Sequence, residues 1–202
     1  MSTPTNTTTK TKTPTIAAIV TERDTGHKGI TARANSVQAD ASDRKTRWQD
    51  YLNNPLSLDR PAAMALYHEH QALEPMAAAF NPQMLEFQLR AFDVRFFAEE
   101  KDVCLAALAA ELDAVLERQP GFVEKIKTGL VAKITQAWDK ATRREDRDKL
   151  LADRDAQEAK LEVLETNIGY AKAAVARFAS APTPEHFGEV RSAISFVKSA
   201  LA

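Results

Sequence analysis

The longest uninterrupted pattern in the chain, residues 122–180, sets the strongest limit on its fold. These 59 residues contain no proline and only two glycines, so little in them terminates a helix. Apolar residues recur there at alternating steps of three and four, the spacing that places side chains on one face of a helix. Toward residue 180 this spacing is that of a coiled coil. The residues of this last stripe are Leu161, Leu164, Ile168, Ala171, Val175 and Phe178.

The length of this stretch raises the question of whether it forms one helix or a hairpin. A continuous helix over residues 122–180 would extend for about 88 Å, whereas a compact domain of the helical residues would be roughly 40 Å across. The chain must therefore turn near residues 142–148 or form an elongated molecule. Because no Gly, Pro or Asn marks a turn there, we favour the elongated molecule, and the hairpin stays open.

A second long helix is expected earlier in the chain. Asn81 followed by Pro82 is a strong start signal, because Asn caps helices and Pro is favoured in the first turn. No further Gly or Pro occurs before Pro120, which predicts a helix over about 82–118. Pro120 and Gly121 then predict a turn.

Two shorter helices are expected on either side of these. Ser57 or Asp59 can cap a helix over about 61–73, after which Pro75 is expected to restart the chain. Thr183 and Pro184 start an amphipathic helix over about 184–201. Such a helix packs on the chain's own bundle or joins subunits. Its apolar stripe consists of Phe187, Val190, Ile194, Val197 and Leu201.

The first 45 residues differ from the rest in composition. Eight of the first fifteen residues are Thr, and a segment with so little to bury cannot offset its ordering entropy. We therefore expect a flexible, Thr-rich basic arm over residues 1–45 and a helical body over residues 46–202. The predicted fold class is all-α: an elongated helical bundle or coiled coil with long helices and a disordered or extended N-terminal arm. Within the arm, the apolar run with Ile16, Ile19 and Val20 is a candidate docking motif for a sheet edge or groove.

Charge is divided unevenly between the arm and the body. Residues 1–47 hold eight basic and four acidic side chains, whereas the other 155 residues hold 19 basic and 24 acidic ones. The net charge of −1 argues against a protein whose whole surface binds nucleic acid. The basic arm is expected to bind an acidic partner, which includes the body of another copy of the chain. It could also make weak, salt-sensitive contacts with nucleic-acid phosphates.

No motif in the sequence indicates an active site or a bound cofactor. His68 and His70 lie two residues apart, which places them on different sides of a helix, so they cannot share a metal ion. The single cysteine, Cys104, lies in an Ala- and Leu-rich stretch typical of a buried thiol. No phosphate-binding loop and no nucleophile elbow occurs. We therefore expect no catalytic residue, cofactor, metal or small-molecule substrate, and we expect that the protein is not an enzyme.

These features predict a structural or assembly protein that acts through protein–protein contacts. It would be an oligomeric adaptor or a subunit of a larger particle, such as a phage virion or a secretion machine, with other protein subunits and copies of itself as partners. Two alternatives stay open: a regulator or inhibitor that docks on one enzyme, and a nucleic-acid-associated protein that uses the basic arm. The predicted contact residues are Ile16, Ile19, Val20, Leu161, Leu164, Ile168, Val175, Phe178, Phe187, Val190, Ile194 and Val197.

The hydropathy of the chain indicates where in the cell the protein is expected. No apolar run approaches the ~18 residues that a membrane span needs, and the first residues lack a signal-peptide pattern. We therefore expect no membrane contact and a location in the cytoplasm or within a particle assembled inside the cell. The identity of the partner and the number of subunits stay open.

Overall fold

The computed structural model describes residues 14–202, and every regular element in that range is a helix. The predicted all-α fold class is therefore confirmed. The chain divides into two compact units, and each is described by itself. Of the described residues, unit 1 comprises 14–19 and 97–202, and unit 2 comprises 20–96. Within residues 14–202, no helix is both long enough and apolar enough to cross a lipid bilayer.

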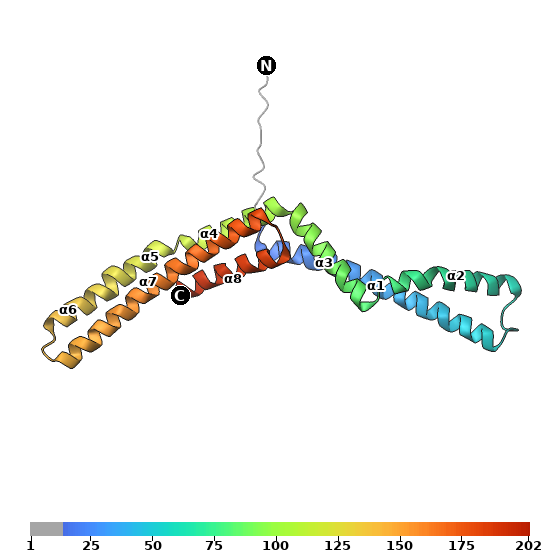
Figure 1. The fold of residues 1–202 in the computed structure, drawn as a ribbon, viewed down its shortest axis with the longest axis horizontal. Helices are drawn as coiled ribbons and strands as arrows, with labels where there is room; N and C mark the ends of the chain where they lie inside the picture. Colours follow the sequence, from blue (N-terminus) through green and yellow to red (C-terminus); the bar gives the residue numbers. More distant parts are fainter. Residues whose placement is uncertain (1–13) are drawn as a thin grey trace, which may run out of the picture. The chain divides into compact units, whose positions relative to one another are not determined.

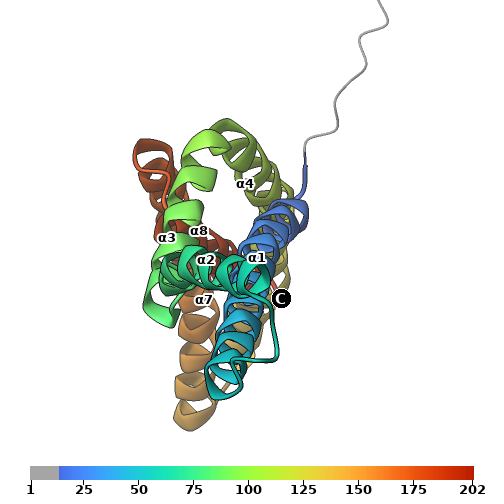
Figure 2. The same ribbon diagram turned by 90° about the vertical axis from the view of Figure 1, so that its right-hand side faces the viewer.

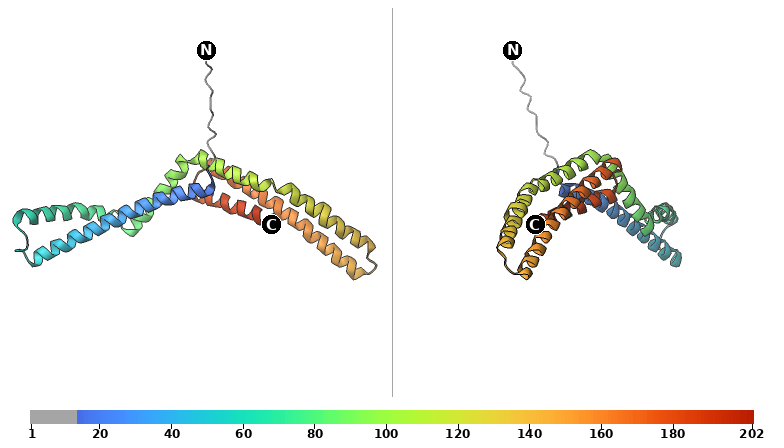
Figure 3. Two further views of the ribbon diagram at one scale, coloured as in Figure 1. Left: turned by 180° about the vertical axis from the view of Figure 1, so that it is seen from behind. Right: turned by 60° about the vertical axis from the view of Figure 1, so that its left-hand side comes forward.

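Unit 1 is built around α7 (Arg144–Ser180), which runs antiparallel to a row of shorter helices (Figure 1). Helix α8 (Pro184–Ala200) folds back against α7 and also contacts α4, so these three helices form a small bundle. The same arrangement is visible from behind and from the side in Figure 3. The row comprises α4 (Lys101–Leu116), α5 (Gln119–Glu124), the π-helix η1 (Lys125–Val131) and α6 (Ala132–Lys140).

The core of unit 1 forms where the apolar stripes of α4, α7 and α8 meet the last turn of α3 (Pro82–Glu99). Phe97, Phe178 and Phe187 are its aromatic centre, with ring centroids 4.7 Å apart for Phe97–Phe187 and 5.7 Å apart for Phe178–Phe187. Thr183 caps α8 as predicted, and its hydroxyl oxygen accepts a hydrogen bond from the His186 backbone N–H at 3.2 Å. The core also contains Cys104, Leu108, Leu112, Leu164, Ile168, Val190, Ile194 and Val197.

Residues 122–180 form a hairpin, so the preference for one continuous helix is wrong. Helix α6 ends at Lys140 and α7 begins at Arg144. Side chains close this turn in place of a turn residue: the Nε–H of Arg147 donates to the carbonyl oxygen of Ala141 at 2.8 Å. The Arg147 guanidinium also lies 5.2 Å from the centre of the Trp138 ring, within the range of a cation–π contact. Such contacts leave no Gly or Pro signal in the sequence.

Unit 2 contains most of α1 (Ile16–Asn53), all of α2 (Arg60–Ala78) and most of α3 (Pro82–Glu99). Helices α1 and α2 form an antiparallel hairpin and lie side by side in Figures 1 and 2. Long side chains connect them: Trp48 packs on Tyr67 with ring centroids 5.2 Å apart, and Arg44 pairs with Glu69 at 2.7 Å. The side-chain amide of Gln38 in α1 also donates to the carbonyl oxygen of Phe80, in the turn after α2.

Helix α1 contradicts the predicted arm over residues 16–45, and the predicted domain boundary at 45/46 falls inside this helix. Thr15 starts α1, because its hydroxyl oxygen accepts a hydrogen bond from the backbone N–H of Ala18 at 3.2 Å. Partly or fully buried positions then recur in α1 at steps of three and four, but several carry polar or small residues such as Arg23, Gly26 and Arg44. Because these inward positions are not apolar, the sequence lacks the apolar periodicity from which a helix would be predicted. Residues 1–13, on which the rest of the arm prediction falls, lie outside the described range.

Two further boundaries differ from the predictions. The helix expected over 82–118 is divided at Glu100 into α3 and α4. Pro120 lies in the first turn of α5 rather than in a turn of its own, a position where its missing N–H costs nothing. Asp59 and Asn81 cap α2 and α3 as predicted, accepting from Ala62 and Met84, but α2 continues past Pro75 to Ala78.

Candidate functional site

The predicted contact residues of α7 and α8 lie in the core of unit 1. Seven of them are buried, Leu161 and Val175 are half-buried, and together they hold α8 on α7. Ile16 and Ile19 are also buried, and Val20 is half-buried. Partner contact through these residues stays a prediction, and it would require α8 to separate from α7. The buried seven are Leu164, Ile168, Phe178, Phe187, Val190, Ile194 and Val197.

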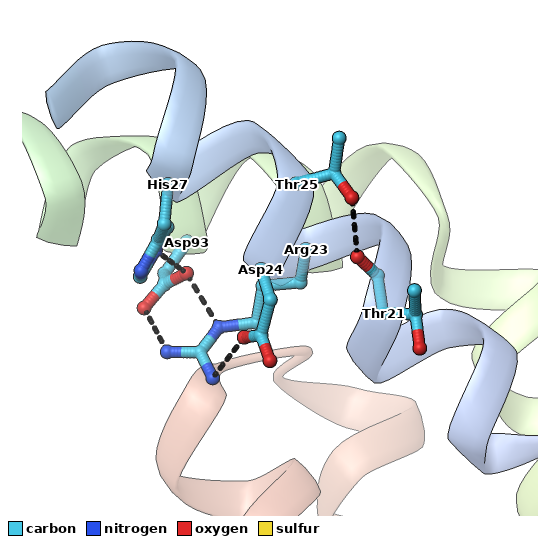
Figure 4. Close-up of polar contacts among 6 residues, drawn as sticks. All are labelled: Thr21, Arg23, Asp24, Thr25, His27 and Asp93. Atoms are coloured by element: carbon cyan, nitrogen blue, oxygen red, sulfur yellow. Dashed lines mark hydrogen bonds and ion pairs between the residues drawn. The ribbon is translucent and has the colours of Figure 1, made fainter. Parts of the chain in front are cut away.

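A buried carboxylate marks the contact between α1 and α3 in unit 2 (Figure 4). Asp93 of α3 is 7 % exposed. The Arg23 guanidinium binds it in a bidentate manner, with Nε 2.7 Å from Oδ1 and Nη2 2.7 Å from Oδ2. His27 lies one turn further along α1, and its Nε2 donates to Oδ1 at 2.7 Å. Both oxygens of Asp93 therefore have a donor from α1.

The electrostatics of this cluster keep Asp93 ionised. Burial alone would raise the pKa of Asp93, but the hydrogen bonds from Arg23 and His27, together with the charge of Arg23, lower that pKa below its ordinary value. The hydrogen bond to Asp93 raises the pKa of Arg23. The carboxylate is paired and fully hydrogen-bonded, which suits it to fix the position of α1 on α3 rather than to react with a substrate.

A glycine beside this cluster lets the two helices approach. A side-chain carbon added at Gly26 would overlap the ring of Phe92 on α3. The ring of His27 also meets Phe92 edge-on, with centroids 5.6 Å apart. The sequence gives a weak signal for this contact, because a glycine within a Thr-rich stretch resembles a turn.

Unit 1 carries a partly exposed polar network between α7 and α8. Arg177 donates two hydrogen bonds to Glu189, at 3.1 and 2.6 Å, and the hydroxyl of Tyr170 donates to the same carboxylate at 3.1 Å. The hydrogen bond from Arg177 lowers the pKa of Glu189, and the hydrogen bond to Glu189 raises the pKa of Tyr170. This network joins two surface helices and leaves no group poised as an acid or base.

Two adjoining hollows lie on the surface of unit 1, near the end of α8. The first has a volume of about 460 Å³ and lies among α5, η1, α7 and the C-terminal end of α8. The second, of about 480 Å³, shares Val163 with the first and is bordered by Phe196. The lining of the first is mostly apolar, with Phe122, Ile126 and Leu130 beside the two lysines Lys125 and Lys160, and has no carboxylate side chain, histidine or cysteine. Such a surface suits apolar side chains of a partner better than a polar substrate.

Unit 2 exposes large apolar side chains. Phe87 is 64 % exposed and Val94 is 55 % exposed on α3, and Leu56 is 96 % exposed in the loop between α1 and α2. Met64 and Met76 of α2 are exposed as well. By contrast, the buried apolar residues of unit 2 are Ala34, Ala63, Leu66 and Phe96.

The basic residues that were predicted to serve an arm are partly committed to other contacts. Arg23 is paired with Asp93, and Arg44 is paired with Asp43 and Glu69.

Comparison of the chain with protein-family models, with curated proteins and with solved structures found no significant match in any of the three. A functional interpretation therefore rests on the surfaces and contacts of the chain itself.

Proposed function

We propose that the chain is a non-enzymatic assembly protein that acts through protein–protein contacts, as a helical adaptor or a subunit of a larger particle. The observation that carries this proposal is the surface of unit 2, where Phe87, Val94, Met64 and Met76 are exposed while few apolar residues are buried. Large apolar side chains that a unit leaves exposed are candidates for contact with a partner, which would bury them. A partner that covers this surface would supply the burial that unit 2 lacks.

The hollows of unit 1 support the same proposal. Their apolar lining lies beside Val163 and Phe196, which are themselves exposed. A neighbouring subunit would find apolar surface on both units, on α2 and α3 as well as on α7 and α8. This distribution favours a component with several contacts over an enzyme with one recessed site.

Methionine footprinting tests the proposal, because Met64, Met76 and Met84 are all exposed on unit 2. We expect these methionines to be oxidised rapidly in the dilute purified chain and slowly in native lysate, where crosslinking and mass photometry should place the chain in a complex. Trp138 of unit 1, which is also exposed, provides an internal reference for oxidant dose. A chain that stays monomeric in lysate with all three methionines fully reactive would overturn the proposal. One partner at fixed stoichiometry would favour the regulator over the assembly component.

A further inference from the structure

One face of α7 is covered by α8 along part of its length and is open along the rest. Residues on this face recur at steps of three and four. In the covered part, Phe178 packs on Phe187 of α8, and the side-chain amide of Asn167 donates to the carbonyl oxygen of Phe196 at 3.4 Å. Figures 1 and 3 show α8 beside this part of α7 alone. The buried residues of the face are Ala171, Ala174 and Phe178, and the exposed ones are Ala156, Lys160 and Val163.

The open part of this face is the floor of a groove, because the two hollows of unit 1 adjoin there and share Val163, Ser199 and Ala200. The lining of this groove follows α7 from Ala156 to Asn167, a distance of about 16 Å or three helical turns. Small residues of α7 and α8 separate the larger apolar side chains, so another helix can approach closely. The larger apolar side chains are Phe122, Ile126, Leu130, Val163 and Phe196.

Two lysines give the groove a positive charge. Lys125 of η1 and Lys160 of α7 both line it, and no acidic side chain lines either hollow. The ammonium group of Lys160 donates to the neutral side-chain amide of Gln157 at 3.1 Å. Within residues 14–202, neither lysine forms an ion pair with a carboxylate. The charge of the groove therefore complements an occupant that carries acidic side chains beside an apolar face.

We propose that an amphipathic helix of a partner protein, with acidic residues beside its apolar stripe, packs along α7 in this groove. There it takes the place that α8 takes further along the same face of α7. The part of unit 1 in which α7 packs on η1 and α6 alone then becomes a bundle of three helices. This inference rests on the proposed function and specifies the chemistry of one partner.

A helix fits the groove better than an extended segment does. An extended segment buried on an apolar lining would leave backbone N–H and C=O groups without partners. All regular elements between residues 14 and 202 are helices, so unit 1 offers no strand edge to pair with them. A helix forms these hydrogen bonds internally, and its apolar side chains recur at the spacing of the α7 face. The first 13 residues of the chain itself do not match the groove, since their charged residues are Lys10 and Lys12.

Selection from a displayed library of random peptides, each of about 15 residues or four helical turns, tests the proposal with the full chain as bait. We expect the enriched peptides to carry apolar residues at helical spacing and an excess of Asp and Glu. Val163→Glu should lower their affinity at least tenfold, with an unchanged far-ultraviolet spectrum because Val163 is 54 % exposed. The matched control is Val103→Glu, at an exposed site of α4 outside both hollows, and it should bind like the parent. Failure to enrich any peptide, or affinity that Val163→Glu leaves unchanged, would overturn the proposal.

Charge reversal provides the second measurement. Lys125→Glu combined with Lys160→Glu should weaken binding of the enriched peptides at least fivefold, and the effect should shrink as salt is added. The control combines Lys149→Glu with Lys172→Glu, two exposed lysines of α7 outside the groove, and should change binding little. Equal effects of the two double variants, or enriched peptides without acidic residues or helical spacing, would overturn the proposal.

The same variants separate this inference from its alternatives. Self-association of the parent chain that Val163→Glu abolishes in sedimentation velocity would assign the groove to a second copy and overturn the proposal. If the methionines of unit 2 are protected in lysate while the groove selects no acidic helical peptide, the proposed function stands and only the inference about the groove fails.

Discussion

The two units of this chain are held together in different ways. In unit 1, continuous apolar stripes on α4, α7 and α8 meet in a core whose centre is Phe97, Phe178 and Phe187. In unit 2, α1 meets its neighbours through a buried ion pair, a glycine and long polar or aromatic side chains, such as Asp93, Gly26 and Trp48. Unit 1 gains stability from the amount of surface it buries, whereas unit 2 depends on a few specific contacts.

This difference predicts how each unit responds to change. A core that is stabilised by buried area loses most when a large side chain is removed, and it is insensitive to pH. A contact that is stabilised by an ion pair and by close approach of two helices loses most stability when the charged group is removed or a small residue is enlarged. Hydrogen exchange measured peptide by peptide on the full chain gives the stability of each unit separately. Exchange in α8 measures the stability of unit 1, and exchange in the middle of α1 measures that of unit 2.

Removal of a core ring should have the largest effect. Phe178→Ala deletes a fully buried ring that packs on Phe97 and Phe187, so we expect a loss of about 3–5 kcal/mol in the free energy that protects α7 and α8 from exchange. Protection in the middle of α1 should change much less. The control, Phe196→Ala, removes an exposed ring and should cost less than about 1 kcal/mol. Equal losses in α1 and α8 would show that the units unfold together and would remove the contrast.

Neutralisation of the buried carboxylate should have the next largest effect, in the opposite unit. Asp93→Asn keeps the shape but removes the charge that Arg23 and His27 bind, so we expect a loss of about 1.5–3 kcal/mol in unit 2. Asp24→Asn is the control, because that carboxylate is exposed and lies 4.0 Å from Arg23. It should cost less than about 0.5 kcal/mol. If the two variants behave alike, Asp93 does not hold α1 on α3.

The same contrast explains what could be predicted from the sequence. Unit 1 follows from spacing, because the stripes from Leu164 to Phe178 and from Phe187 to Val197 are regular and become its core. Helix α1 was not predictable in this way, since its inward positions include Arg23 and Gly26, which resemble a solvated loop. Those residues become interior only through Asp93 and Phe92 on α3, some 70 residues further along the chain.

The caps could be predicted and the hairpin turn of unit 1 could not. Asn81 and Thr183 act on N–H groups within three residues, so local sequence suffices to predict them. The turn after α6 depends on Arg147 reaching back to Ala141 and Trp138, and no short-range turn signal encodes that contact. The exposed surfaces of α3 and α7 were likewise not predictable, because their spacing alone does not show which face is buried.

Two glycines of α1 should give smaller effects of opposite sign. Gly26→Ala places a carbon in the Phe92 ring, so α1 and α3 must separate, and we expect a loss of about 1–2 kcal/mol in unit 2. Gly29→Ala has open space around the added carbon and improves helix propensity, so it should gain about 0.5–1 kcal/mol. Thermal unfolding followed by circular dichroism, with exchange in α1, measures both. A gain at both sites would show that α1 and α3 are not closely packed at Gly26.

Acid should reveal the smallest difference between the units. The pKa of Asp93 is lower in the folded chain than in the unfolded one, so its contribution is fully present above the unfolded value of about 3.9 and is lost as pH falls through the folded value. The loss cannot exceed that of Asp93→Asn, since a protonated carboxyl resembles an amide, and it is incomplete while pH stays above the folded pKa.

Glu189 provides the comparison in unit 1, because its pKa is also lowered, but its side chain is 27 % exposed against 9 % for Asp93 and it contributes less. Between pH 5 and pH 3, exchange protection should therefore fall more in α1 than in α8, and Asp93→Asn should flatten the response of α1 alone. An equal fall in both helices, or an unchanged response of α1 in the variant, would assign the acid sensitivity to groups other than Asp93. Unit 2 would then depend on burial as unit 1 does, despite its few buried side chains.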